Sequence, residues 1–392
     1  MKLSKYATAA ALIGAFAAAG CTVDVPDFDA PGVDTSIVTP GAPDDADYAN
    51  AGENLRNGVG SLYIEFDGIP VGGYLCTGTA ISPRHVLTAA HCVFEPNDTV
   101  RRVRFVLTAG RDAPAIIDAS SFEIHPWYKL SLQFGYGAFA HGDLAIIELA
   151  DDLPAGTEVY ELYRGNDEFG QETRHYGHGK AGKGNKGATE DADFFYGRTG
   201  LNMYEQTLAP FMGDGITDQL LHDFDSGGIK HNAMEWWFTS QWACSPRIDN
   251  PDQAQDGQCT TFKDGSYPDF QGFGKFEVGI GPGDSGGPGF IDGKIAGVHS
   301  FGFTHWCQGS TNTCDFDCEL NSSYGEMAGD TRVSYHAGWV DDVMTYGTTI
   351  PVPEIPSAAG AGASAATNVA PLTQRGQAFV DATLADTAAP LV

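Results

Sequence analysis

The stretch Gly281-Pro282-Gly283-Asp284-Ser285-Gly286-Gly287-Pro288 places one serine within a run of glycine and proline residues. Glycine adopts backbone angles that other residues avoid, so such a run can form a tight turn whose N–H groups converge on one point. A hydroxyl at the apex of this turn would be exposed, and a negative charge developing beside it would meet those N–H groups. The pattern therefore indicates a nucleophilic serine, with an ordinary loop turn as the simpler alternative.

A second stretch runs from residue 76 to residue 92 and reads Cys-Thr-Gly-Thr-Ala-Ile-Ser-Pro-Arg-His-Val-Leu-Thr-Ala-Ala-His-Cys. Residues 74–81 alternate loosely between apolar and polar, which predicts a strand, and a second strand is expected from residue 86. A disulfide between Cys76 and Cys92 would close a loop worth about 3 kcal/mol in the chain-entropy model. We predict this bridge because it would also fix the turn that presents His91.

A third stretch, His-Gly-Asp-Leu-Ala-Ile-Ile-Glu-Leu at residues 141–149, places Asp143 directly before an apolar segment. The simple alternative is that this aspartate is just the polar end of a loop. This stretch alone is therefore a weak signal of a functional site. Upstream of it, residues 125–128 read His-Pro-Trp-Tyr. The three candidate side chains follow one another along the chain in the order His91, Asp143, Ser285.

Together, these stretches resemble the motifs of the chymotrypsin-fold (trypsin-like) serine proteases, and of their secreted bacterial members in particular. The resemblance covers about residues 57–348 and implies an all-β fold of two antiparallel six-stranded β-barrels with a C-terminal helix. It also implies a catalytic triad of His91, Asp143 and Ser285, and an oxyanion hole formed by the N–H groups of Gly283 and Ser285. Polypeptides are the expected substrates, and no metal ion or organic cofactor is expected.

The alternative function is a non-catalytic binding module on the same fold. In family members that are activated by proteolysis, a freed apolar N-terminus pairs with the aspartate that precedes the serine. Asp284 stands at this position, but the sequence has no recognisable activation site before Tyr63. The sequence therefore leaves open how Asp284 is paired.

The substrate pocket is expected to involve Gly279, His299, Ser300 and Gly302, by their positions relative to Ser285. The trypsin branch carries an aspartate six residues before the serine, where this chain has Gly279, so no strong preference for Lys or Arg is expected. The position of His299 resembles that of a histidine in the glutamate-specific branch, which would favour an acidic residue before the cut. We favour a small or apolar preference over the acidic one.

The remaining cysteines suggest further bridges. Cys244 and Cys259 are expected to pair around a loop. Another three cysteines are crowded together, and we expect one local bridge and one leftover thiol among them; zinc bound by these thiols and His305 is the alternative. These three are Cys307, Cys314 and Cys318.

An acidic turn follows at residues 223–225, Asp-Phe-Asp. It could bind Ca²⁺ through carboxylate oxygens. A solvated turn without any ion is the interpretation that we favour.

The N-terminus indicates export. Lys2 and Lys5 precede an alanine-rich apolar run at residues 7–19, which is too short to span a membrane and predicts a signal peptide over residues 1–20. The run ends in Ala-Ala-Gly-Cys, which resembles the lipobox of bacterial lipoproteins. We therefore expect lipidation of Cys21 and a place in the bacterial cell envelope, with contact to a membrane only through this anchor. Cleavage of an ordinary signal peptide near Ala19, giving a secreted protein, is the alternative.

Composition and chain length set the outer limits of the folded domain. Residues 21–56 are rich in acidic residues and proline and predict an extended tether, and residues 349–392 predict a low-complexity tail. The barrels are expected at about residues 57–165 and 170–348, with an insertion at about residues 180–275. The net charge of −29 argues against a nucleic-acid partner, because such a chain repels phosphate backbones.

Overall fold

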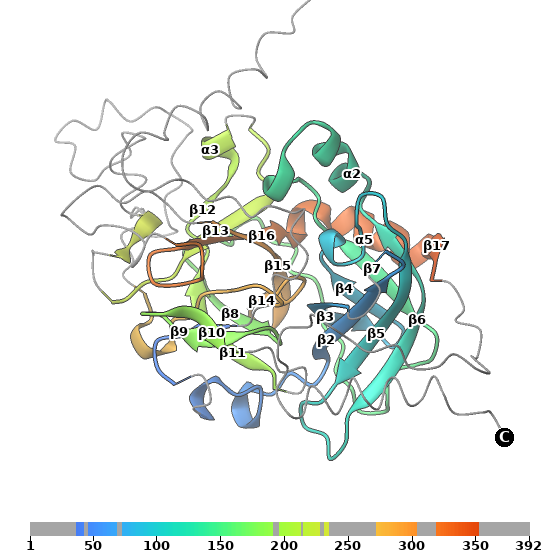
Figure 1. The fold of residues 1–392 in the computed structure, drawn as a ribbon, viewed down its shortest axis with the longest axis horizontal. Helices are drawn as coiled ribbons and strands as arrows, with labels where there is room; N and C mark the ends of the chain where they lie inside the picture. The colour runs from blue at the N-terminus through green and yellow to red at the C-terminus, as the bar shows by residue number, and fades with distance from the viewer. Residues whose placement is uncertain are drawn as a thin grey trace, which may run out of the picture.

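The computed structural model describes residues 37–42, 46–68, 73–190, 196–212, 215–227, 231–234, 272–303 and 319–352. Most of the regular structure in these residues is antiparallel β-sheet, arranged as two bodies that lie side by side (Figure 1). None of the helices in this part of the chain has the length and hydropathy needed to cross a bilayer. The predicted all-β class is confirmed.

The first body is a closed barrel of six strands, because its first and last ladders meet when β6 pairs with β7. A short seventh strand, β17 (Ile350–Pro351), extends the edge at β6. The barrel strands are β2 (Val59–Phe66), β3 (Tyr74–Ser82), β4 (His85–Thr88), β5 (Val100–Leu107), β6 (Ala115–Ile124) and β7 (Ala145–Leu149). The strands predicted at residues 74–81 and from residue 86 are β3 and β4.

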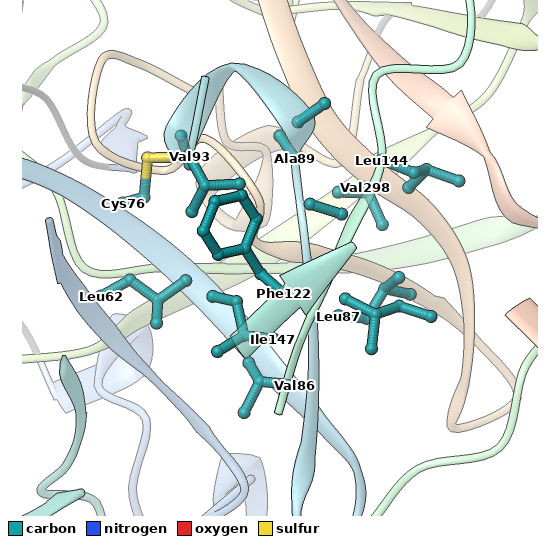
Figure 2. Close-up of a cluster of buried hydrophobic side chains, with 14 of the residues drawn as sticks. Leu62, Cys76, Val86, Leu87, Ala89, Val93, Phe122, Leu144, Ile147 and Val298 are labelled. Atoms are coloured by element: carbon teal, nitrogen blue, oxygen red, sulfur yellow. A yellow bond between two sulfur atoms is a disulfide. The ribbon is translucent and has the colours of Figure 1, made fainter. Parts of the chain in front are cut away.

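The interior of this barrel is filled with aliphatic and aromatic side chains. Leu62, Val86, Phe122 and Ile147 come from four different strands and pack together (Figure 2). Val298 belongs to the second sheet but lies in the same cluster. Burying each such side chain stabilises the fold by about 1.5–3 kcal/mol, so the two sheets are joined by shared apolar packing.

The second body is a seven-stranded sheet in the order β11-β8-β14-β15-β16-β13-β12. No ladder joins its two edges within the described residues. The Nδ2 group of Asn202 on β11 instead donates to Asp223 O on β13 at 2.7 Å and to Val278 O at 2.9 Å. The strands are β8 (Glu172–Gly177), β11 (Arg198–Met203), β12 (Gln206–Thr207), β13 (Gln219–Asp223), β14 (Pro288–Ile291), β15 (Lys294–Phe303) and β16 (Met327–Arg332).

Within the described residues, helices are few and short, apart from the predicted C-terminal helix, α5 (Val333–Tyr346), which directly follows β16. The others are α2 (Pro126–Gln133), α3 (Ala209–Met212) and the 3-10 turns η1 (Ala46–Tyr48), η2 (Gly52–Asn54), η3 (Ala90–Cys92), η4 (Gly137–Phe139) and η7 (Gly274–Phe276).

The structure shifts both predicted ends of the folded domain. Ile37 and Val38 are fully buried, and β1 (Val38–Thr39) pairs in parallel with β9 (Ala181–Lys183), so the predicted tether packs on the second sheet from residue 37 onward. These residues belong to a short β-branched run, which suits a strand. At the other end, β17 and the bond from Val352 N to Ser120 O keep the chain on the first barrel past residue 349.

The region predicted as an insertion also supplies part of the second sheet. β11, β12 and β13 lie within residues 180–275, as do β9 and β10 (Gly187–Glu190), so this range is not a single added segment. Residues 235–271, with Cys244 and Cys259, lie outside the described residues. The same holds for residues 1–36, with Cys21, and for residues 304–318, with His305, Cys307, Cys314 and Cys318.

Candidate active site

His91 lies in η3, at the end of β4. The predicted disulfide is present: Cys92 in the same turn is bonded to Cys76 on β3, with Cα atoms 6.2 Å apart. Ala89, just before the turn, packs in the core of the first barrel (Figure 2). The turn that carries His91 is therefore held from both sides, by a covalent bond and by apolar packing.

Asp143 holds His91 through two hydrogen bonds. Its Oδ2 lies 2.7 Å from His91 Nδ1, and its Oδ1 accepts from His91 N at 2.9 Å. Ser300 Oγ donates to Oδ2 at 2.5 Å. The Asp143 side chain is only 4% exposed, and these donors replace the water that its carboxylate loses on burial. Asp143 is thus arranged to fix both the tautomer and the orientation of the imidazole.

A further carboxylate, Asp218, fixes the segment that carries Asp143. Asp218 Oδ1 lies 2.6 Å from His141 Nδ1, while Oδ2 accepts from Gly142 N at 2.9 Å and lies 3.1 Å from His336 Nε2. Burial alone would raise the pKa of the Asp218 carboxyl, but the hydrogen bonds with His141 and His336 outweigh it and hold that pKa below its usual range. Sequence reasoning missed Asp218, because no motif surrounds it and its partners are far away in the chain.

Ser285 lies in the predicted tight turn. Gly283 and Gly286 have φ angles of 95° and 82°, which favour glycine, and a Cβ on Gly286 would lie 2.0 Å from Thr88 Oγ1. Thr77 on β3 fixes the turn, since its N donates to Ser285 O at 2.8 Å and its Oγ1 to Gly283 O at 3.0 Å. The N–H groups of Gly283 and Ser285 donate to no acceptor within the described part of the chain. Both are therefore available to an oxyanion.

Asp284 is fully buried beside this turn. Its Oδ2 accepts from Gly281 N at 3.0 Å and its Oδ1 from Gly179 N at 3.4 Å. Burial raises the pKa of the Asp284 carboxyl to about 7, against the lowering effects of His299 and these N–H groups. A Cβ on Gly177 would lie 1.7 Å from Asp284 Oδ1, so the glycine at this position leaves room for the carboxyl. The partner of Asp284 that the sequence left open includes two backbone N–H groups.

A cleft of about 470 Å³ runs along these residues. Its lining includes most of the predicted site residues: His91, Gly283, Ser285, His299, Ser300 and Gly302. Glu95 is the single carboxylate that the described residues contribute to it. The structure brings Ser285 of the second sheet and His91 of the first barrel to one surface.

The prediction that Gly279 lines the pocket is wrong. Gly279 exchanges two backbone hydrogen bonds with Val38, at 2.9 and 3.0 Å, and a Cβ there would lie 2.8 Å from the Phe224 ring. The residue is turned toward β1, which occupies this side of the second sheet, and does not reach the cleft. Ser300 lines the cleft as predicted, but its hydroxyl is committed to Asp143.

Comparison with known proteins finds one family match. Residues 57–193 match the family model described as Trypsin. This chain carries a domain of the trypsin family. No curated protein matches it. Among solved structures, it is similar to a collagenase (HL collagenase; 14% identity, TM-score 0.45, 74% of this chain and 94% of that chain) and to neuropsin from mouse brain (15% identity, TM-score 0.45, 76% and 98%).

The trypsin-like domain has an unusual second sheet, whose interior holds many polar side chains. Asp223 and Asp225, which we expected in a solvated turn, are buried beside Glu205 and Glu277. Burial, followed by neighbouring negative charge, raises the pKa of Glu205 well above its usual value. The acidic turn is therefore part of the interior.

Proposed function

We propose that this trypsin-like chain is an exported serine endopeptidase that hydrolyses peptide bonds through an acyl-enzyme. The observation that carries the proposal is the double hydrogen bond of Asp143 to His91, at the edge of a cleft that Ser285 also lines. A binding module has no need for a buried carboxylate that orients an imidazole beside a serine. The rival function, a non-catalytic module at the cell envelope, is therefore the weaker one.

In the proposed reaction, Ser285 Oγ attacks the carbonyl carbon of the scissile bond, and His91 Nε2 takes the hydroxyl proton. The N–H groups of Gly283 and Ser285 stabilise the negative oxygen of the tetrahedral intermediate. His91 then gives the proton to the leaving amine. In the second half of the reaction, water attacks the acyl carbon, His91 takes a proton from this water, and the proton passes to Ser285 Oγ as the ester bond breaks. Asp143, bonded to His91 Nδ1, stabilises the imidazolium that forms.

For specificity, we propose a small or apolar residue before the cut. The lining near Ser285 offers Gly281, Pro282 and Gly302, and the one carboxylate that the described residues contribute to the cleft, Glu95, closely follows His91 in the chain. An acidic preference through His299 is the alternative, but His299 Nδ1 is already bonded to Asp330 at 2.9 Å. A peptide library scanned at this position tests the proposal, and strong cleavage after Lys or Arg would contradict it.

For export, we propose cleavage of residues 1–20 and lipidation of Cys21. The disulfide Cys76–Cys92 supports an oxidising compartment, because such bonds are rare in the cytosol. Mass spectrometry of the mature N-terminus in the native host tests this. A free, unmodified terminus near residue 20 would favour the ordinary signal peptide instead.

Labelling with a fluorophosphonate probe tests the activity most directly. The wild-type protein should be labelled at Ser285, and Ser285→Ala should abolish both labelling and peptide hydrolysis. Ser120→Ala, which removes an exposed hydroxyl on β6, is the matched control and should retain both. A well-folded wild-type protein that is not labelled would favour the binding module.

A further inference from the structure

Two histidines and an aspartate meet inside the second sheet, away from the triad. His175 lies on β8, His222 on β13 and Asp330 on β16, and their exposed fractions are 0%, 1% and 0%. β8 and β13 are not neighbours in the sheet, so the two histidines approach one another across its concave interior. The proposed protease mechanism uses none of the three.

Their donor atoms converge without pairing. His175 Nδ1 lies 3.9 Å from Asp330 Oδ2, and His222 Nε2 lies 3.8 Å from Asp330 Oδ1, which is too far for a hydrogen bond in both cases. One ligand atom from each of the three residues lies within 4.8 Å of the others. None of the four ring nitrogens of His175 and His222 has a hydrogen-bond partner among the described residues. Buried polar atoms without partners cost about 1–3 kcal/mol each, so a ligand that bound these nitrogens would stabilise this interior.

The surroundings are arranged to hold Asp330. Its Oδ1 lies 2.9 Å from His299 Nδ1, and its Oδ2 accepts a hydrogen bond from the Tyr204 hydroxyl. Space for this arrangement depends on a glycine, because a Cβ on Gly297 would lie 2.7 Å from Asp330 Oδ2 and 2.1 Å from the Tyr204 oxygen. Hydrogen bonds that orient a ligating carboxylate in this way are typical of metal sites.

We propose that His175, His222 and Asp330 bind a divalent transition-metal ion of the zinc class inside the second sheet. Two imidazoles and one carboxylate suit zinc, whereas calcium and magnesium require oxygen ligands. Zinc bonds of about 2.0–2.2 Å can join atoms up to about 4 Å apart, which covers both separations to Asp330. The ion would accept the lone pairs that the ring nitrogens leave unused.

The second candidate cluster in the described residues, Cys76, His91 and Cys92, is not a metal site. Its two sulfur atoms are bonded to each other, and its histidine is held by Asp143. The ion bound by His175, His222 and Asp330 would have a structural role and not a catalytic one. It ties β8, β13 and β16 together across a sheet whose edges no ladder of the described residues joins, and it acts on the cleft through His299.

Metal analysis of the full-length protein, purified without chelators from zinc-supplemented medium, tests the proposal. We expect about one zinc per chain. Dialysis against dipicolinate should lower the melting temperature by about 5 °C or more, and Zn²⁺, but not Ca²⁺, should restore it. Cobalt substitution should give visible d–d absorption without the intense near-ultraviolet band of cobalt thiolates, which separates this site from one made by the cysteines.

The variant His175→Gln/His222→Gln should lose the zinc, the cobalt spectrum and the zinc-dependent shift. His85→Gln, which alters a histidine on the first barrel, is the matched control and should keep all three. The zinc content and the melting temperature of the wild-type protein test the proposal without any variant. They remain decisive even if the double variant misfolds. A wild-type protein without zinc whose melting temperature does not respond to added Zn²⁺ would overturn the proposal, as would a double variant that keeps its zinc. Activity enters none of these readouts, so the result is independent of the proposed peptidase function.

Discussion

The interiors of the two sheets differ in kind. The first barrel is closed, and its centre consists of side chains such as Leu62, Phe105 and Ile147 that need only contact and burial. The second sheet is open and encloses His175, Tyr204, His222, Asp330 and several carboxylates, each of which needs a particular partner. Apolar packing tolerates any arrangement that fills space, whereas buried polar groups allow few arrangements. The first interior therefore serves as a scaffold, and the second as a set of specific sites.

The largest effect is expected where the two bodies meet, at the proposed triad. Asp143→Asn keeps the size of the side chain but favours the wrong tautomer of His91, and kcat should fall by about 10⁴ as in the family's triad template. Steady-state peptide hydrolysis measures this. Asp151→Asn, an exposed change just after β7, is the control and should leave kcat unchanged. A loss below tenfold for Asp143→Asn would show that His91 is oriented by other groups.

One side-chain truncation in each body should show how the two interiors contribute to the free energy of unfolding. Phe105→Ala removes a fully buried ring from the first barrel and should lower the free energy of unfolding by about 3–5 kcal/mol. Tyr204→Phe removes only the hydroxyl bonded to Asp330 and should cost about 1–3 kcal/mol. Urea unfolding measures both. If Tyr204→Phe left the free energy of unfolding unchanged, the stability of the second interior would not depend on this hydrogen bond.

Loss of the disulfide should act on the first barrel alone. Cys76→Ser/Cys92→Ser should lower the free energy of unfolding by about 3 kcal/mol, as the chain-entropy model gives for a loop of this size. Activity should fall before the fold is lost, because the bridge holds the turn of His91. Activity and circular dichroism followed through a urea titration test this order. Coincident loss of the two signals would contradict it.

Asp218→Asn should destabilise the segment before Asp143 by about 1.5–3 kcal/mol, since it weakens hydrogen bonds to a charged group. The pKa of Asp218 is lowered in the folded state, so its contribution is present above the unfolded pKa of about 3.9 and lost as pH falls. The deficit of the variant should accordingly be full at pH 7 and shrink in acid. A deficit that does not change with pH would exclude ionised Asp218 as its cause.

Asp284 should show the opposite pH dependence. Its pKa is raised to about 7, so the folded state binds a proton that the unfolded state releases near pH 4, and stability falls as pH rises between these values. Asp284→Asn should flatten this fall by up to about 1.4 kcal/mol per pH unit. Urea midpoints at pH 5 and pH 8 measure the difference. Parallel curves for wild type and variant would contradict the raised pKa.

The residues that the sequence identified correctly lie in continuous motifs. The strands beside His91, the bridge Cys76–Cys92 and the tight turn of Ser285 each depend on neighbours within about twenty positions, and alternation, cysteine spacing and glycine content report such local features. Gly279 was placed wrongly because β1, from a stretch expected to be an unstructured tether, covers it.

The contacts that the sequence did not predict join residues that are far apart in the chain. Asp218 lies 77 positions from His141 and 118 from His336, and His222 reaches His175 only because the sheet curves. Nothing local marks any of these residues as a partner of another. Sheets create such contacts through ladders between remote segments, and a pattern read along the chain does not contain them.

The sequence by itself determined the trypsin-like fold class, the order of His91, Asp143 and Ser285, and the disulfide, because strong local constraints on backbone and spacing encode them. Only the tertiary structure decided which groups support that chemistry: Ser300 on Asp143, Asp218 behind it, and Asp330 among the histidines of the second sheet. The physical reason is that a buried charge or ring nitrogen takes its character from whatever the fold brings against it. The amino-acid sequence limits which side chains are present, but three-dimensional packing decides which of them interact.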